Sequence, residues 1–156
     1  MSSKAVNSNL SNVTFGMIKP EAFERGLVTE IERRICAAGL VIEDKKVVVM
    51  TREQVFILYG HIEARVPEIY AVMEDYLVTN QVEVLKIRGC DALARLLAVR
   101  GASNPSDAAP GTVRGDYAKD QGYDKRGKKL SLNVFHAADS VEEVKKALEL
   151  FFGGYK

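Results

Sequence analysis

The stretch SLNVFHAADSVEEV (residues 131–144) contains His136, one of only two histidines in the chain. An imidazole has an unperturbed pKa of about 6.5, so at neutral pH it is largely uncharged and able to act as a nucleophile. Its position also allows a plainer interpretation, a polar residue at a strand end that is hydrogen-bonded to a nearby carbonyl group. Other residues of the chain decide between these alternatives.

Two cationic residues occupy positions that would suit an anion. Lys19 ends the apolar run VTFGMIK (13–19), and a buried strand that finishes in a lysine needs solvent or an anion for its charge. Arg114 precedes Gly115, which allows a close backbone approach, and a guanidinium can pair bidentately with phosphate. Exposure of both side chains to solvent is the plainer alternative.

Alternating strand and helix patterns position these residues. Strands are predicted over 13–19, 40–50, 81–87 and 130–136. Helices are predicted over 21–38, 52–64, 68–78, 91–100 and 141–152. Ser140 and Glu143 have the spacing of a capping box at the start of the last helix. The order predicts an α+β fold, a ferredoxin-like sandwich in which a four-stranded antiparallel sheet is covered by helices on one face.

Length and composition predict a flexible N-terminal tail (1–12) and a single domain (13–156). The formal net charge of +1 gives no global signal for nucleic acid or an anionic membrane. Cys36 and Cys90 lack metal-ligand spacing and are interpreted as reduced core thiols. The first dozen residues lack the apolar run of a secretory signal, and no stretch is long enough to span a membrane. A cytoplasmic location is therefore expected.

Residues 101–130 show no clear periodicity. A loop this long is usually functional or disordered, and Pro105 and Pro110 predict that its first half is ordered. The basic second half, YAKDQGYDKRGKKL (117–130), is interpreted as a solvated loop. Nucleic-acid binding through this insert is disfavoured, because it depends only on four basic residues: Lys125, Arg126, Lys128 and Lys129.

Three segments resemble the nucleoside diphosphate kinase family in order and spacing. They are TFGMIKPEAFERGLV (14–28), SNPSDAAPGTVRGD (103–116) and NVFHAADS (133–140). The family patterns there are close to TFxxIKPD-x(3)-RGLVGEI, TNPxxAxPGTIRGD and NxxHGSDS. The resemblance covers residues 13–152 and favours the nucleophile over the plainer interpretation of His136. It implies transfer of the terminal phosphoryl group from a nucleoside triphosphate to a nucleoside diphosphate, by a ping-pong mechanism through a phosphohistidine.

The resemblance also implies roles for other residues. Lys19 and Tyr59 would lie at the transferring phosphoryl group, Ser103 and Arg114 at the phosphates, and Asn133 at the ribose. Without the resemblance, Tyr59 would be interpreted as a residue of a helix core. Nucleotide-bound Mg²⁺ is the implied cofactor, with no metal site in the protein itself. A homo-oligomer, either a hexamer or a tetramer of dimers, is the implied assembly.

The chain departs from the family pattern at two substrate-contacting positions. The family's second phosphate-binding arginine aligns with Leu97, and Arg95 is predicted to replace it, with Arg100 as the alternative register. The family's aromatic base platform lies in an RPFF run, which reads RVPEIY here (65–70). Tyr70 or Ile69 is predicted to take its place.

Two further departures concern the surroundings of the histidine. A serine and a glutamate that pair beside it in the family align with Ala138 and Ala147, and the segment between Asp116 and Asn133 is longer than in the family pattern. Together the departures support an alternative function, a weakly active family member that serves as a nucleotide-dependent binding or regulatory subunit.

Overall fold

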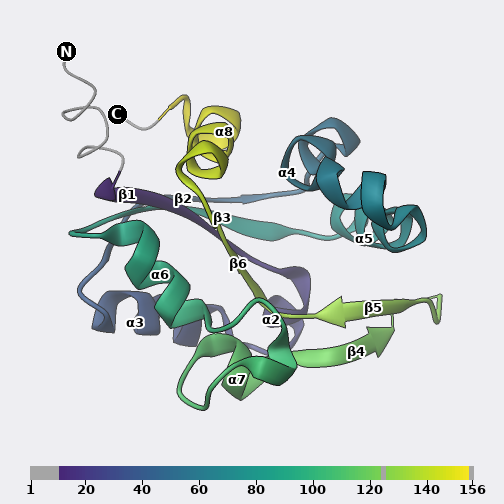
Figure 1. The fold of residues 1–156 in the computed structure, drawn as a ribbon, viewed down its shortest axis with the longest axis horizontal. Coiled ribbons are helices and arrows are strands. Elements are labelled where there is room, and N and C mark those ends of the chain that lie inside the picture. Colours follow the sequence, from purple (N-terminus) through teal and green to yellow (C-terminus); the bar gives the residue numbers. More distant parts are fainter. Residues whose placement is uncertain (1–10, 124–125, 155–156) are drawn as a thin grey trace.

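The computed structural model describes residues 11–123 and 126–154, and Figure 1 shows its fold. Four antiparallel strands form the central sheet in the order β2-β3-β1-β6. These strands are β1 (Val13–Ile18), β2 (Val41–Val48), β3 (Val82–Arg88) and β6 (Phe135–Ala137). The central strand β1 pairs with both β3 and β6, so Met17 stands opposite Val84 on one side and His136 on the other. The predicted four-stranded antiparallel sheet is confirmed.

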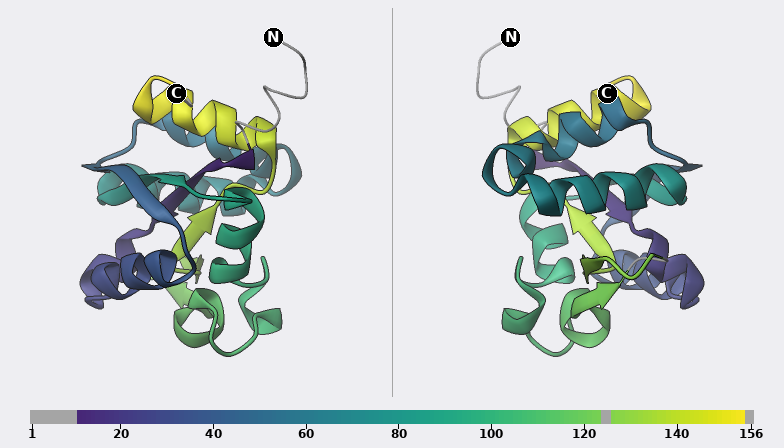
Figure 2. Two further views of the ribbon diagram at one scale, coloured as in Figure 1. Left: turned by 90° about the vertical axis from the view of Figure 1, so that its left-hand side faces the viewer. Right: turned by 90° about the vertical axis from the view of Figure 1, so that its right-hand side faces the viewer.

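Helices cover both faces of the sheet, whereas the sequence predicted helices on one face (Figure 2). One face carries α4 (Arg52–Arg65), α5 (Pro67–Thr79) and α8 (Val141–Phe152). The other carries α2 (Pro20–Glu24), α3 (Val28–Ala37), α6 (Ala92–Arg100) and α7 (Val113–Tyr117). Because successive strand residues point to opposite faces, Phe15 and Met17 enter the first core and Ile18 enters the second. Two covered faces explain why every residue of β1 is buried.

Two predicted elements are divided in the structure. The helix predicted over 21–38 breaks into α2 and α3 around Gly26, whose φ of +67° is unfavourable for other residues. The strand predicted over 130–136 divides into β5 (Lys129–Leu132), which leaves the main sheet, and β6, which belongs to it. The second break lies at Asn133 and Val134, inside one of the segments that resembles the kinase family.

The basic insert forms a β-hairpin, so its interpretation as a solvated loop is wrong. Strand β4 (Lys119–Tyr123) pairs with β5 in a separate two-stranded sheet. Gly122 packs so closely on Leu132 that an added Cβ would lie 2.2 Å from that side chain. Arg126 forms an ion pair with Asp75 of α5. Charged residues and glycine are poor strand formers, so this pairing depends on cross-strand contacts that periodicity does not reveal. Lys125 lies outside the described residues.

Cys36 and Cys90 are exposed free thiols, so their interpretation as core residues is wrong. Cys36 follows the buried Ile35 on α3 and therefore points to the outer side of that helix. Residues 1–10 of the predicted tail lie outside the described part of the chain, whereas the carbonyl of Asn12 accepts a hydrogen bond from Gly89. Within the described ranges, no helix combines the length and apolar character needed to cross a membrane.

Candidate active site

The chain turns sharply at Val134, between β5 and β6. Val134 has a φ of +58°, in the left-handed region that β-branched residues avoid at a cost of about 1–3 kcal/mol. Its peptide groups are held on both sides by the segment that follows β1. The N–H of Val134 donates to Oε1 of Glu21 (2.8 Å), and its carbonyl accepts from the N–H of Lys19 (2.9 Å). The turn brings Asn133 and His136 to the end of β1.

His136 is buried on β6 and contacts a carboxylate of the last helix. Its Nε2 lies 2.8 Å from Oε1 of Glu143, and the other oxygen of Glu143 accepts from the N–H of Asp139 (2.8 Å). The side chain of Ser140 caps α8 by accepting from the N–H of Glu143 (3.2 Å). Half of the predicted capping box is therefore present, while the carboxylate that would complete it binds His136 instead.

The surroundings favour an uncharged His136 and an ionised Glu143. Burial lowers the pKa of His136, an effect that the hydrogen bond and charge of Glu143 oppose and that Lys19 and Arg114 reinforce. Burial alone would raise the pKa of Glu143, but its hydrogen bonds with His136 and with the N–H of Asp139 bring it below its ordinary value. An ionised carboxylate only accepts hydrogen bonds, so Nε2 carries the ring proton and Nδ1 carries the lone pair.

Lys19 and Tyr59 lie beside the imidazole. The ammonium of Lys19 is buried, and burial lowers its pKa to about 8, with Glu21 raising it and Arg114 lowering it. Its Nζ lies 5.6 Å from the centre of the Tyr59 ring. Tyr59 meets His136 edge-on, with ring centres 5.4 Å apart at 63°. Burial raises the pKa of Tyr59, so its hydroxyl keeps the proton and remains a donor.

Two buried arginines hold the backbone on either side of His136. Arg114 donates through Nε and Nη2 to the carbonyl of Phe135 (3.1 and 2.9 Å). Arg100 donates through Nη1 to the carbonyl of Ala137 (3.3 Å). Burial lowers the pKa of Arg114 to about 10, and the charge of Arg100 contributes to this shift. We refer to Lys19, Arg100 and Arg114 as the cationic cluster. Concentrated buried charge of one sign favours a bound anion.

The same arginines bind the loop that follows α6. Arg114 donates through Nη1 to the carbonyl of Ser103 (2.7 Å), and Arg100 donates through Nη2 to the Ser103 hydroxyl (3.3 Å). Nη1 of Arg100 also forms an ion pair with Oδ1 of Asp139 (3.0 Å). Ser103, predicted at the phosphates, therefore lies between the two guanidinium groups.

Tight packing fixes the position of Arg114. Thr112 caps α7 by accepting from the N–H of Gly115 (3.0 Å). A Cβ on Gly115 would lie 1.9 Å from the carbonyl oxygen of Ala109, so only glycine fits there. Asp116 accepts from the N–H of Gly111 (2.9 Å) and from Arg34 (2.7 Å). The first half of the long loop is ordered, as predicted.

Two buried polar atoms of the site have no hydrogen-bond partner among the described residues: the hydroxyl of Tyr59 and Oδ1 of Asn133. Such atoms normally find a partner, and leaving one unpaired costs about 1–3 kcal/mol. A tyrosine hydroxyl can donate to a phosphate oxygen, whereas an amide oxygen accepts from a hydroxyl group. Both atoms therefore suit a ligand that carries phosphate and hydroxyl groups.

Arg95 does not join the cationic cluster. Its Nη1 donates to the carbonyl of Ala38 at the end of α3 (3.2 Å), and Arg100 occupies the position predicted for it. Five residues along a helix correspond to a rotation of about 140°, so side chains at 95 and 100 point to different sides of α6. The alternative register, which places Arg100 at the site, agrees with the structure.

Tyr70 does not present a ring face for a nucleotide base. It is buried in the core between the sheet and α4, α5 and α8, with Leu58 and Leu77 in the same apolar cluster. Ile69, the other candidate, is exposed. Tyr70 was predicted from the alignment of RVPEIY with the family's RPFF run, and this alignment does not show that its position on α5 points inward, into the core.

Glu143 is a site residue that the sequence interpretation missed, because it was assigned only to the capping box. The family's glutamate aligns with Ala147, one helical turn further along α8, and residues four apart share a helix face. Glu143 therefore supplies a carboxylate on the same face one turn earlier. Ala138 and Ala147 are both fully buried in the apolar core beneath.

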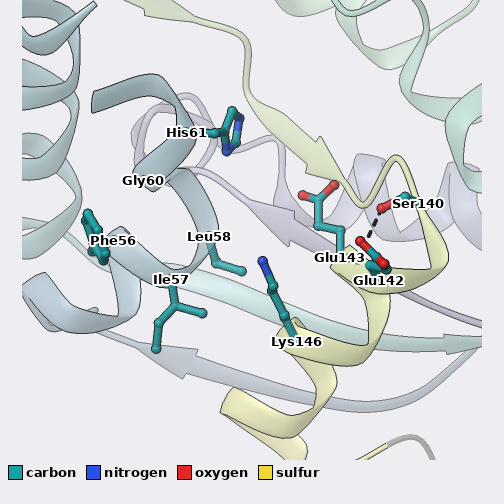
Figure 3. A pocket seen from close by; sticks show the side chains of 9 residues that line it. All are labelled: Phe56, Ile57, Leu58, Gly60, His61, Ser140, Glu142, Glu143 and Lys146. Atoms are coloured by element: carbon teal, nitrogen blue, oxygen red, sulfur yellow. Dashed lines mark hydrogen bonds between the residues drawn. The ribbon is translucent and has the colours of Figure 1, made fainter. Parts of the chain in front are cut away.

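A cavity of about 590 Å³ lies between α4 and α8, and Glu143 is among its lining residues. Figure 3 shows the side chains that line it. Phe56 and Ile57 line it from α4, and Glu142 and Lys146 line it from α8. Glu142 and Glu143 both line this cavity, and their negative charges repel those of phosphate groups. The cationic cluster, not this cavity, suits a phosphate ligand.

Comparisons with known proteins extend over nearly the whole chain. A family model described as nucleoside diphosphate kinase matches residues 12–156. The chain is 37% identical over 140 residues to a nucleoside diphosphate kinase of Deinococcus radiodurans, covering 90% of this chain and 94% of that protein. It is 34% identical over 139 residues to one of Archaeoglobus fulgidus, covering 89% and 85%.

Solved structures of the same description resemble the fold. The apo crystal structure of nucleoside diphosphate kinase from Encephalitozoon cuniculi superimposes with a TM-score of 0.77 at 31% identity, covering 91% of this chain and 89% of that one. An NDP kinase from Pyrobaculum aerophilum gives a TM-score of 0.75 at 25% identity, covering 90% and 95%. The residues matched by the family model include His136 and the cationic cluster.

Proposed function

Because the chain belongs to the nucleoside diphosphate kinase family and is therefore a nucleotide-binding phosphotransferase, we propose that it transfers the terminal phosphoryl group through His136. The resemblance of the three sequence segments to this family is thereby confirmed. The observation that carries the proposal is the uncharged, buried imidazole held by Glu143 beside the cationic cluster.

In the first half-reaction, Nδ1 of His136 would attack the γ-phosphorus of a nucleoside triphosphate. The Nδ1–phosphorus bond forms while the bond from phosphorus to the bridging oxygen breaks, and the diphosphate leaves with that electron pair. The ring then carries a positive charge, which the ionised Glu143 at Nε2 stabilises. The second half-reaction reverses these steps with another diphosphate as acceptor, so a single site suffices and the kinetics are ping-pong.

The cationic cluster would bind the phosphates and offset the charge that spreads over the transferring group. Tyr59 would donate its unpaired hydroxyl to a phosphate oxygen, and Ser103 would contact the phosphates from the loop. Asn133 would accept from a ribose hydroxyl through its unpaired Oδ1. The contacts of the cationic cluster, Tyr59 and Asn133 would satisfy groups that the protein alone leaves charged or unpaired.

Mg²⁺ would enter the site bound to the nucleotide. Among the described residues, no group of three or more histidine, cysteine or acidic side chains is arranged to hold a metal ion, whereas the cationic cluster fits phosphate oxygens. The phosphates would hold the ion. Asp139, which forms an ion pair with Arg100 of the cationic cluster, is a carboxylate beside the proposed phosphate site. When bound with the nucleotide, Mg²⁺ would neutralise part of the negative charge of the phosphates.

A homo-oligomer is proposed as the assembly. Strand β2 lies at an edge of the sheet and exposes the valines at 41 and 47, with exposed fractions of 63% and 54%. An edge strand presents unpaired N–H and C=O groups that can pair with a second chain. Light scattering at several concentrations should give a mass above that of one chain, and Val47→Glu should lower it; a monomer at all concentrations would contradict the proposal. The cytoplasmic location stays a prediction.

The alternative of a weakly active regulatory subunit is not favoured. Its support was the altered second arginine, the altered base platform and the missing serine–glutamate pair. From other positions, Arg100 donates to the carbonyl of Ala137 beside Arg114, and Glu143 contacts His136. A binding subunit has no need for a desolvated lysine, an oriented imidazole and two buried arginines in one place.

The test is incubation with γ-³²P-labelled ATP. Wild-type protein should form an acid-labile, base-stable phosphoenzyme and pass the label to added nucleoside diphosphates, whereas His136→Ala should do neither. His61→Ala, which removes the chain's other histidine from the exposed side of α4, is the matched control and should label normally. Label on His136→Ala, or its loss in His61→Ala alone, would overturn the proposal.

A further inference from the structure

Val134 requires an explanation that the proposed mechanism does not provide. It is a fully buried, β-branched residue at positive φ, between Asn133 and His136. Such a conformation persists only where the surroundings hold it, because valine disfavours this region. The contacts that hold it determine how the backbone enters β6, and therefore where the imidazole of His136 lies.

Glu21 provides the side-chain contact that holds this turn. Its Oε1 accepts from the N–H of Val134 (2.8 Å) and its Oε2 accepts from the hydroxyl of Tyr76 on α5 (2.8 Å). Glu21 is itself buried, at the start of α2, so neither bond competes with bulk water. Burial and the neighbouring Glu21 raise the pKa of Tyr76, so its hydroxyl keeps its proton and donates.

The hydrogen bonds form a chain from one wall of the site to the other. Tyr76 on α5 positions the carboxylate of Glu21, and Glu21 binds the peptide of Val134 that precedes the nucleophile. The N–H of Lys19 binds the other side of the same residue (2.9 Å). The segment that carries Lys19 therefore also determines the placement of the segment that carries His136.

We infer that Glu21 is a positioning residue, which holds Val134 at positive φ by hydrogen bonding and so aligns His136 for phosphoryl transfer. This inference rests on the proposed function for its kinetic consequence only. Glu21 contacts none of the reacting atoms, and the placement of the turn is measurable in the protein without nucleotide.

The first test separates hydrogen bonding from charge. Glu21→Gln keeps an oxygen to accept from Val134 and an amide that can donate to the Tyr76 oxygen, whereas Glu21→Leu keeps neither. In single-turnover measurements at saturating ATP, Glu21→Leu should slow phosphoenzyme formation by about tenfold or more, and Glu21→Gln should stay within about threefold of wild type. Glu24→Leu, an exposed carboxylate on the same helix, is the matched control and should be unchanged. Equal losses in Glu21→Gln and Glu21→Leu, or no loss in Glu21→Leu, would overturn the inference.

The second test uses the backbone directly. Glycine adopts positive φ without strain, so Val134→Gly should reduce the dependence on Glu21. The penalty of Glu21→Leu should be at least about threefold smaller in the Val134→Gly background, whereas additive effects would overturn the inference.

An amide proton shift provides a readout independent of turnover. In the nucleotide-free protein, Glu21→Leu should move the Val134 amide proton upfield, because it loses a carboxylate acceptor, while Glu24→Leu should not. An unmoved Val134 signal would overturn the inference. Failure of the proposed function would instead appear as no phosphoenzyme in wild type, with the amide shift still present.

Discussion

Replacing Glu143 with glutamine changes the two hydrogen bonds that orient the proposed nucleophile. Both partners of the carboxylate are donors, the ring Nε2–H of His136 and the N–H of Asp139. A glutamine amide offers one acceptor and one donor group, so it can satisfy only one of them. If its NH₂ group faces the ring, the imidazole proton moves to Nδ1 and the lone pair points away from the phosphoryl group.

The expected magnitude follows from the charge of the lost partner. A hydrogen bond to a charged group contributes about 1.5–3 kcal/mol. The bond strengthens as the ring becomes cationic on phosphorylation, so this energy is lost mainly from the transition state. Since each 1.36 kcal/mol corresponds to a tenfold change in rate, Glu143→Gln should slow phosphoenzyme formation by about 10- to 150-fold.

Rapid-quench measurement of labelled phosphoenzyme at saturating ATP is the assay, repeated across pH. The charge of Glu143 raises the pKa of His136, so its removal should lower that pKa. Because the uncharged ring is the proposed nucleophile, the acid limb of the rate profile should move to lower pH. The loss near neutral pH therefore cannot come from protonation of the imidazole.

Glu142→Gln is the matched control, since Glu142 is adjacent, exposed and in the same first turn of α8 (Figure 3). Both variants lose a carboxylate that interacts with the helix dipole, which contributes about 0.3–1 kcal/mol. Only Glu143→Gln should slow the chemical step. A rate for Glu143→Gln within threefold of wild type, or an equal loss in Glu142→Gln, would refute the reasoning.

Three further predictions concern the neighbouring residues. Arg100→Ala should lower kcat/KM by about tenfold or more through loss of charge-assisted phosphate contacts, while Arg95→Ala should change it little. The reverse result would show that Arg95, not Arg100, is the second phosphate-binding arginine. Burial lowers the pKa of Lys19 to about 8, so kcat/KM should fall as the pH rises through that value. Lys19→Arg should move this fall in kcat/KM to higher pH, and a fall at the same pH would show that another group causes it. Ala147→Glu should lower the free energy of urea unfolding by at least about 1–3 kcal/mol, because it buries an unpaired carboxylate. Adding Ala138→Ser to this variant should recover part of the loss. Strictly additive effects would mean that the side chains at 138 and 147 do not contact each other.

The predictable features of the fold have local causes. The apolar runs of β1 and β3 and the periodic helices α4, α5 and α8 all appear close to their predicted positions. The β4–β5 hairpin was missed because its residues have low strand propensity and form strands only through pairing with each other. The break at Val134 was missed because nothing in the alternating pattern of 130–136 indicates a positive φ.

The site was predictable where a motif specifies both residue and position. Lys19, Ser103, Arg114, Asn133 and His136 lie in the three segments that resemble the family, and the structure brings those segments together at the end of β1. The predictions failed where the motif was altered. Arg95 was chosen by counting along the chain, whereas the helix rotation directs Arg100 to the carbonyl of Ala137.

The sequence by itself determined the family, most of the strands and helices, and which histidine is proposed as the nucleophile, because motif spacing and hydrophobic periodicity are properties of contiguous residues. Only the tertiary structure decided which glutamate orients His136, which arginine accompanies Arg114, and what holds Val134 in its unfavourable conformation. Each of these depends on groups distant in sequence, such as Glu21 and Val134, which lie 113 residues apart and are joined by one hydrogen bond. The sequence around either residue does not predict such a pair, because a glutamate at the start of a helix has the same sequence pattern whether it faces solvent or a buried N–H group.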